Sequence, residues 1–396
     1  MEIYLDNSAT TKVTEGVRDK VLQVLYEDYG NPSSMHRLGV KAEQHMKDAA
    51  VIIAGSLKVE PKEIIFTSGG TEANNLALIG TAMANKRKGN HIITTAIEHP
   101  SVHEPLAYLG ENGFSISRVP VDASGRLEQE KLLAMVNENT LMVSIMYVNN
   151  EIGSVQNVAA LAAALKEKKK DLIFHVDAVQ AFGKYKIYPK REGIDLLSFS
   201  GHKIHGPKGI GALYVSDKIK LHPIVFGGGH QRGLRSGTEN VPGIAGLGQA
   251  VKELTIDFEE KIERMYRLKQ KFLREVSKLE GVTINGVPSD GATDFEMEEL
   301  KKSAPHIMSV SFQGVRSEVF LHALEDKGIY VSSGSACSTH HPAPSVTLTS
   351  IGMPKDLMDS TLRISMSGNT TEEEIDITLE NIKELLPVLR RYTRKK

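Results

Sequence analysis

The sequence of 396 residues contains no tryptophan and a single cysteine, and neither sign of charge is in excess. One cysteine excludes an intrachain disulfide framework and any zinc site built on several cysteines, and it is typical of a reducing compartment. The formal net charge of −1 argues against a general nucleic-acid or anionic-membrane surface. No stretch approaches the ~20 apolar residues of a transmembrane helix, and the start, with Glu2 and Asp6, does not resemble a secretory signal. We therefore expect a cytoplasmic protein.

The rest of the composition is ordinary for a globular protein, with 40 % apolar and 24 % charged residues. At roughly 150 residues per domain, the length predicts two to three domains. Between residues 60 and 215, short apolar runs typical of buried strands alternate with helix-like stretches such as Thr71–Asn85 and Asn157–Lys168. The runs are Ile64–Thr67, Ile92–Thr95, Leu141–Met146, Leu172–Val176, Leu196–Phe199 and Ile210–Val215. This alternation predicts a mostly parallel sheet with helices on both faces, whose ligands bind beyond the carboxyl ends of the strands.

The pattern changes near residue 240. Apolar residues then recur at steps of three and four from Ile244 to Leu279, which predicts one long helix that ends near Gly281. Residues 282–396 mix strand-like and helix-like pieces and predict a second, smaller α+β domain. Within it, residues 290–303 are rich in aspartate, glutamate and glycine, and we expect an exposed acidic loop without chemistry.

Two loops that follow predicted strands contain groups suited to an anion and a cation. Thr67 to Thr71 is a strand end, two glycines and a helix start, where free N–H groups favour a phosphate. Glycine loops are common, however, and on this feature alone a plain turn with a threonine cap is the favoured interpretation. No Walker or dinucleotide-binding pattern accompanies it. A very apolar run ends in Asp177, whose carboxylate either caps the next helix or faces a cation such as a protonated ring nitrogen.

Two further loops contain nucleophiles. Lys203 follows a strand end among serine, glycine and histidine, where desolvation would lower the pKa of its amine and make it nucleophilic. His202 and His205 lie beside it, but their spacing is a weak metal pattern and we assign no metal. Cys337, the only cysteine, lies in a polar segment of small residues followed by His340 and His341, which are imidazoles suited to forming its thiolate.

Taken together, these motifs make the chain similar to one family, the group I cysteine desulfurases of the NifS/IscS type, within the class V aminotransferase family of fold-type I pyridoxal 5′-phosphate (PLP) enzymes. The resemblance runs from Tyr4 to Asp376. It depends on the stretches YLDNSATT, GNPSSMHRLG, FTSGGTEANNLA, IEHPSV, VNNEIG, HVDAVQ, SFSGHKIHGPKG, RSGTEN and SSGSACS, which occur in the expected order.

The resemblance implies an α/β protein of PLP-dependent transferase fold type I, with a mostly parallel central sheet, helices on both faces and a smaller α+β domain. It implies a large PLP-binding domain at residues 16–250. Residues 1–15 and 251–396 would form the small domain, which would contain a mobile cysteine loop at about residues 330–345.

The resemblance also implies a role for each matching position. Lys203 would hold PLP as a Schiff base, Asp177 would pair with the pyridinium nitrogen, and Gln180 would bind the phenolic oxygen. His99 would stack on the ring and assist proton transfer. The phosphate would be held by Gly70, Thr71, Ser200, His202 and, across a homodimer, the partner subunit's Thr238.

The implied activity is that of a cysteine desulfurase, a sulfurtransferase that converts L-cysteine to L-alanine. Asn149 and Arg363 would fix the substrate carboxylate, and Cys337 would take the sulfur as a persulfide. The sulfur would pass to an acceptor protein for iron–sulfur cluster assembly or for tRNA or cofactor thiolation, without direct contact with nucleic acid or membrane. The sequence leaves open which acceptor is served.

Three other activities compete with this one. A selenocysteine lyase or another class V PLP transferase, for instance an aminotransferase-like enzyme, would keep the cofactor, and an aminotransferase would not need Cys337. A non-catalytic scaffold for sulfur-transfer proteins would bind no cofactor. The intact set of Lys203, Asp177, His99 and Cys337 argues against the scaffold.

Overall fold

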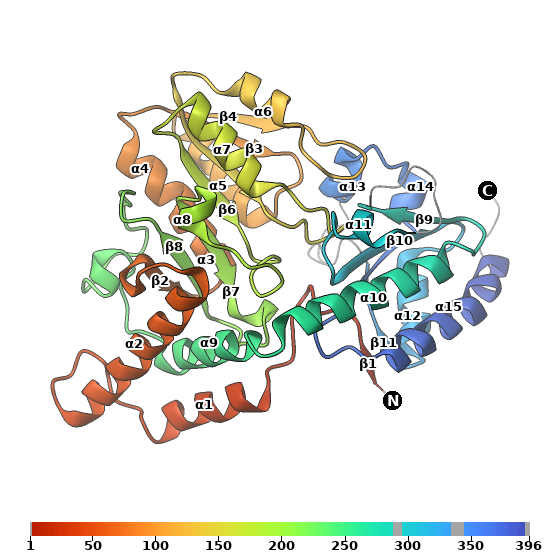
Figure 1. Cartoon of the computed structure of the whole chain (residues 1–396), viewed down its shortest axis with the longest axis horizontal. Helices are drawn as coiled ribbons and strands as arrows, with labels where there is room; N and C mark the ends of the chain where they lie inside the picture. Colours follow the sequence, from red (N-terminus) through yellow and green to blue (C-terminus); the bar gives the residue numbers. More distant parts are fainter. Residues whose placement is uncertain (1, 288–294, 334–343, 393–396) are drawn as a thin grey trace.

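Seven strands form the largest sheet, which runs through one half of the molecule (Figure 1). The computed structural model describes residues 2–287, 295–333 and 344–392. The strand order is β2 (Ile64–Thr67), β8 (Gly211–Val215), β7 (Leu196–Ser200), β6 (Ile173–Asp177), β5 (Thr140–Met146), β3 (His91–Thr95) and β4 (Ser115–Val119). Only β8 runs against its neighbours, so the sheet is mostly parallel. The predicted fold class is confirmed.

Helices cover both faces of this sheet because strand side chains alternate between two apolar layers. Phe174 and Val176 of β6 belong to one layer, and Ile173 of the same strand belongs to the other. The first layer is completed by α2 (Arg37–Leu57), α7 (Val158–Lys168) and α9 (Val241–Leu254). The second is completed by α3 (Gly70–Asn75), α4 (Thr81–Asn85) and α5 (Pro100–Glu111). The same half of the chain contains α1 (Glu15–Tyr26), α6 (Gln129–Met135) and α8 (Pro189–Glu192).

A second core lies around a smaller antiparallel sheet, at the right of Figure 1. Its strand order is β12 (Ser332–Ser333), β13 (Thr361–Ser365), β10 (Ile307–Phe312) and β9 (Val282–Asn285). Helices α10 (Phe258–Val276), α12 (Ser317–Glu325) and α15 (Glu372–Tyr392) pack on it. The short helices α11 (Met297–Leu300), α13 (Val346–Ser350) and α14 (Lys355–Met358) lie between the strands in sequence. The N-terminal β1 (Ile3–Tyr4) pairs in parallel with β11 (Ile329–Tyr330) and so belongs with these elements. The smaller sheet and the elements that pack with it are called the second or small body below, and the seven-stranded sheet with its helices is called the large body.

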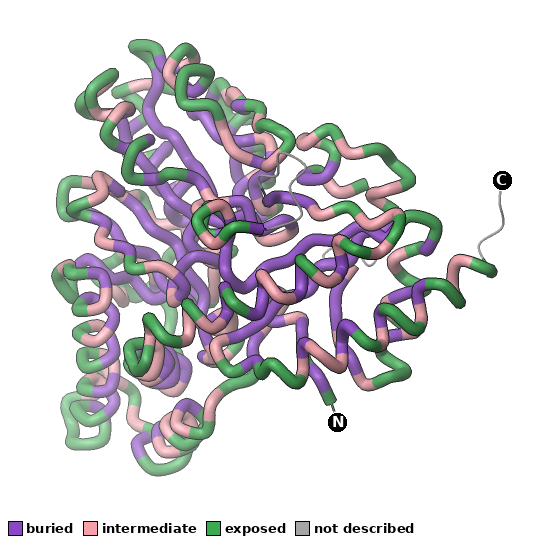
Figure 2. Tube along the Cα trace, turned by 45° about the vertical axis from the view of Figure 1, so that its right-hand side comes forward, coloured by how far each residue is buried: buried purple, intermediate pink, exposed green. Residues whose placement is uncertain are grey.

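All six predicted strands of the large sheet are present, within about one residue of their predicted bounds. The prediction missed β4, because this edge strand of sequence SISRV is half exposed and has no apolar run. Buried residues fill the interior of both cores, and the exposed residues lie on the outer turns (Figure 2). None of the helices in the described ranges is both long and apolar enough to cross a bilayer.

The single long helix predicted from Ile244 to Leu279 was wrong. The chain forms α9 and α10, and Asp257 between them has φ 50° and ψ 34°. Aspartate is one of the few residues that enter this left-handed conformation readily. The apolar stripe continues across the break because α9 packs on the large core and α10 on the small one. Gly281, with φ +65°, turns the chain into β9 rather than ending the helix.

The exposed acidic loop predicted at residues 290–303 was also wrong for its described part. Phe295 and Leu300 are buried in the second core, and Met297–Leu300 is a helical turn. Ser303 is fully buried and bridges to Ser154 of the large body. Residues 290–294 lie outside the described ranges.

Behind this segment, Lys269 of α10 is fully buried and has no carboxylate among its hydrogen-bond partners in the described ranges. Its Nζ donates to Ser303 Oγ (2.8 Å) and to the carbonyl of Ala304 (2.7 Å). Burial lowers the pKa of this amine to about 7. The Lys269 amine is therefore harder to protonate in the folded chain than in the unfolded chain, where it is protonated below pH ~10.4.

Lys269→Met should accordingly weaken the pH dependence of stability. Between pH ~7.5 and ~10 the unfolded state binds the extra proton, so wild-type stability rises with pH by up to about 1.4 kcal/mol per unit. The variant lacks this contribution, and the difference in unfolding free energy between wild type and variant should grow with pH in urea titrations. The exposed Lys301→Met is the matched control and should show no such trend. A difference that stays flat for Lys269→Met would contradict the buried, weakly basic amine.

Candidate active site

A cavity of about 320 Å³ opens beyond the carboxyl ends of β5, β6 and β7, at the boundary with the second body. This volume lies at the small end of the range for small-molecule sites, roughly 300–1,000 Å³. Predicted site residues from widely separated segments line it together: Gly70, Thr71, His99, Asp177, Gln180, Ser200, His202, Lys203 and Arg363. The edge of the parallel sheet thus brings them together as its topology requires.

Asp177 is the last residue of β6, and its carboxylate is buried at the cavity wall. Oδ2 accepts a hydrogen bond from Asn74 Nδ2 (2.8 Å), and Oδ1 accepts one from the backbone N–H of Val179 (2.9 Å). Both donors are neutral, so they orient the negative charge without cancelling it. The arrangement favours a cationic ligand group in the cavity.

His99 precedes α5 and forms its N-cap through Nδ1. Nδ1 accepts from the backbone N–H of Ser101 (3.1 Å), and Ser101 Oγ lies 2.8 Å from the same atom. A nitrogen that accepts from a backbone N–H has no hydrogen, so the neutral ring must carry its hydrogen on Nε2. Burial lowers the pKa of His99, with Asp177 opposing and Lys203 adding to the effect, and the neutral form is therefore favoured.

Lys203 ends the short 3-10 turn that follows β7, and its side chain reaches the N-terminal segment. Nζ donates to the carbonyls of Ser8 and Ala9, the latter at 2.7 Å. Gln180 Nε2 donates to the same Ser8 carbonyl at 3.0 Å. The YLDNSATT segment therefore contributes the backbone carbonyls of Ser8 and Ala9 to the site. The side chains of this segment do not predict that role.

The glycine turn after β2 lies beside Ser200 and His202 and forms the other end of the cavity. Gly69 has φ +156° and ψ −175°, a conformation that is essentially confined to glycine. A Cβ on Gly70 would come within 2.7 Å of Val179 Cγ2, so a larger residue there would require Val179 to shift. The exposed N–H groups of such a turn suit an anion.

His202 and Arg235 complete this end of the site. His202 Nδ1 lies 3.3 Å from Thr10 Oγ1, and burial together with Lys203 and Lys208 lowers the pKa of His202 to about 4. Arg235 Nε donates to Glu72 at 2.8 Å and ties the RSGTEN segment to the glycine turn. Thr238 of that segment is exposed and does not line the cavity of its own chain.

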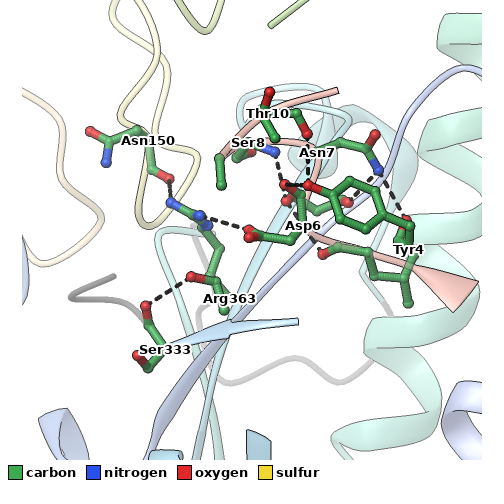
Figure 3. A network of polar contacts seen from close by, with 12 residues as sticks. Tyr4, Asp6, Asn7, Ser8, Thr10, Asn150, Ser333 and Arg363 are labelled. Atoms are coloured by element: carbon green, nitrogen blue, oxygen red, sulfur yellow. Dashed lines mark hydrogen bonds and ion pairs between the residues drawn. The ribbon is translucent and has the colours of Figure 1, made fainter. Parts of the chain in front are cut away.

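Arg363 lies on β13 of the second body and lines the cavity. Figure 3 shows its guanidinium between Asp6 and Asn150. One terminal nitrogen donates to Asp6 Oδ1 (2.9 Å) and the other to the carbonyl of Asn150 (3.0 Å). Asp6 is held in turn by its own segment, where Tyr4 Oη donates to the Asp6 carbonyl (3.2 Å) and the Thr10 carbonyl (2.9 Å). A planar guanidinium held in this way is a preorganised carboxylate ligand.

The structure separates the two asparagines of the VNNEIG turn. Asn149 is fully buried outside the cavity lining, and its amide is used within the protein. It donates to the Ile97 carbonyl (3.0 Å) and accepts from the backbone N–H groups of Glu151 (2.9 Å) and Ile152 (3.0 Å). Asn150, which the sequence reasoning passed over, lines the cavity beside Arg363. The motif itself did not distinguish the two positions.

Glu98 is a buried carboxyl group that the sequence reasoning did not single out. Its Oε1 accepts from Thr95 Oγ1 (2.6 Å) and the backbone N–H of Met146 (3.0 Å), which ties the ends of β3 and β5 together. Burial, aided by the charge of Asp177, raises the pKa of Glu98 to about 8. Burial therefore favours the protonated form of Glu98 at neutral pH.

Cys337 lies outside the described residues, but the segment that follows it is anchored at the site. Ser345, the N-cap of α13, donates its hydroxyl to Glu151 Oε2 at 2.5 Å. Asn149 Nδ2 donates to Thr347 Oγ1 at 3.2 Å. The turn that contains Asn150 thus holds the described end of the cysteine segment close to Arg363.

Comparison with known proteins identifies a matching family. The model of the class-V aminotransferase family matches residues 3–378. A cysteine desulfurase IscS of Methanosarcina thermophila is 39 % identical over 388 residues, which cover 98 % of this chain and 93 % of that protein.

Two solved structures have the same fold. A NifS-like protein superposes with a TM-score of 0.90 at 38 % identity, and the match covers 98 % of this chain and 100 % of the other. The structure described as SspA in complex with cysteine gives a TM-score of 0.79 at 32 % identity, and that match covers 93 % of this chain and 100 % of the other.

The asparagine pair gives a direct test of this geometry. Asn149→Ala leaves a buried carbonyl and two buried N–H groups without partners and should lower the free energy of unfolding by about 2–4 kcal/mol. Asn150→Ala, at the half-buried neighbouring position, is the matched control and should change it by less than about 1 kcal/mol. Urea unfolding of both variants measures the difference. Equal stabilities would mean that Asn149 is not the structural member of the pair.

Proposed function

We propose that this chain, which belongs to the class-V aminotransferase family, is a cysteine desulfurase that transfers sulfur from L-cysteine to its own Cys337. The observation that carries the proposal is the cavity in which the amine of Lys203, the carboxylate of Asp177 and the guanidinium of Arg363 meet. The names of the relatives support it, since the matches cover nearly the whole chain. A relative whose structure is described as a complex with cysteine supports the substrate.

The site fits PLP, the cofactor of the family. Asp177 is a buried carboxyl group held by neutral donors, as a pyridinium nitrogen requires, and the glycine turn that lines the cavity at Gly70 suits a phosphate. We propose that Lys203 holds the aldehyde, that Gln180 donates to the phenolic oxygen and that His99 stacks on the ring. The phosphate would be held by Gly70, Thr71, Ser200, His202 and the partner subunit's Thr238. When bound, this group withdraws electrons from the substrate Cα.

The protein's own groups then do the binding and the proton transfer. Arg363 would fix the substrate carboxylate, and we propose Asn150 beside it, since Asn149 is already used within the protein. Lys203 Nζ would remove the proton from Cα and return one to the product. The thiolate of Cys337 would form a bond to the substrate sulfur as the Cβ–S bond breaks, and Cβ would take up a proton. The products are alanine and a persulfide on Cys337.

The proposal extends to the protein's surroundings. We propose that the protein is cytoplasmic. We also propose a homodimer, because Thr238 is exposed and does not line the cavity of its own chain, so that a second subunit could use it. The persulfide would serve an acceptor protein of iron–sulfur assembly or of tRNA or cofactor thiolation. A selenocysteine lyase is the second candidate, since it would use the same Lys203, Asp177 and Arg363 that line the cavity.

Cys337→Ser tests the sulfur acceptor. The variant should bind the cofactor with an unchanged visible spectrum but lose nearly all production of sulfide and alanine from L-cysteine in the presence of a reductant. Mass spectrometry of the wild type should show one added sulfur on the peptide that contains Cys337. Equal alanine output from both proteins would remove the proposed nucleophile, and activity confined to selenocysteine would favour the lyase.

Asp177→Asn tests the charge of the site. The amide keeps the shape but cannot hold the ring nitrogen as a cation, so turnover should fall by at least about 100-fold. Asp171→Asn, an exposed aspartate just before the same strand, is the matched control and should keep wild-type turnover. Steady-state alanine formation measures both. Near-normal turnover of Asp177→Asn would refute its assigned role.

A further inference from the structure

His306 is a fully buried histidine behind the cavity, one residue before β10. It does not line the cavity, and no motif of the sequence includes it. Its backbone belongs to the second body, because its carbonyl accepts from the N–H of Met366 (2.9 Å). Two residues earlier, Ala304 donates to the carbonyl of Gly153 in the large body (2.7 Å). The imidazole therefore lies where the two bodies meet.

The side chain of His306 contacts one residue of the candidate site. Its Nε2 lies 3.3 Å from Gln180 Oε1, while Gln180 Nε2 donates to the Ser8 carbonyl at 3.0 Å. A carboxamide oxygen only accepts, so His306 Nε2 must carry the hydrogen. In the neutral ring Nδ1 is then bare, and it has no hydrogen-bond partner among the described residues. Together with the Ser8 carbonyl, the histidine thus fixes the orientation of the Gln180 amide.

The groups around His306 keep it neutral. Burial is the main cause that lowers its pKa well below the usual value, and Lys184, Lys269, Arg363 and Lys203 add to it from four different segments. A neutral ring with one N–H is thereby maintained across the physiological pH range.

We propose that His306 is a positioning residue for the cofactor site: its Nε2–H holds the oxygen of the Gln180 amide and keeps the amide N–H directed at the cavity. This inference rests on the proposed function, in which that N–H meets the phenolic oxygen of PLP. Without His306 only the Ser8 carbonyl opposes a half-turn of the amide, and after that turn its oxygen would face the phenolic oxygen with no hydrogen between them. The side chain of His306 in the second body therefore determines how Gln180 in the large body would contact the cofactor.

The test measures the cofactor rather than turnover. Donation to the phenolic oxygen withdraws electron density that otherwise stabilises the proton on the nitrogen joining Lys203 to the cofactor. His306→Leu should therefore raise the pH midpoint of the visible absorption of the bound cofactor by about half a unit or more. His306→Gln, whose amide nitrogen reaches the position of Nε2, should keep the wild-type midpoint. His306→Asn, whose amide is too short to reach it, should behave as the leucine variant and replaces it if that variant does not fold.

A double-mutant cycle separates positioning from general damage to the fold. Gln180→Leu should shift the midpoint in the same direction, and adding His306→Leu to it should produce no further shift. An unchanged midpoint in His306→Leu, or an equal shift in both backgrounds, would overturn the inference while leaving the proposed function intact. Wild-type protein that binds no PLP would instead overturn the proposed function, and the inference with it.

Discussion

The site depends on one buried negative charge. Asp177 ends a central strand of the sheet, and the hydrogen bonds that its two oxygens accept within the described ranges come from the amide of Asn74 and the N–H of Val179. An anion oriented by neutral dipoles is stabilised most by a cation delivered to the same place. The neighbouring carboxyl of Glu98 retains its proton in the field of Asp177, with a pKa of about 8 caused mainly by burial. The cavity thus has a defined polarity before any ligand enters.

The second constraint is that the cavity is built by two bodies. The large body supplies the groups proposed to hold the cofactor, from the ends of its parallel strands. The small body supplies Arg363, and the N-terminal segment supplies the carbonyls that hold Lys203. Asn149 and Glu151, in the turn after β5, are hydrogen-bonded to Thr347 and Ser345, in the described segment that follows Cys337. The large body would therefore bind the cofactor and both bodies would bind the substrate carboxylate, so the relative position of the two bodies sets the geometry of the reaction.

Much of this arrangement was predictable from sequence, for a physical reason. Ligands of parallel sheets gather at strand ends, so Asp177 and Lys203 could be selected from the apolar runs that precede them. Predictions failed where tertiary packing decides the outcome. The break at Asp257 lies within an unbroken apolar stripe, and the choice between Asn149 and Asn150 depends on which side chain is buried. Asn74 and His306 bind partners more than 100 residues away in the sequence, so the residues next to them in the sequence do not predict these contacts.

The central claim is that an amine at position 203 binds the aldehyde of PLP beside the charge of Asp177. Reduction of the holoenzyme with borohydride, followed by digestion and peptide mapping, tests it most directly. We expect the reduced pyridoxyl group on Lys203 and not on Lys184, whose amine is buried nearby with a pKa of about 8. A protein that is colourless after purification with the cofactor, or a pyridoxyl group on any other lysine, would contradict it.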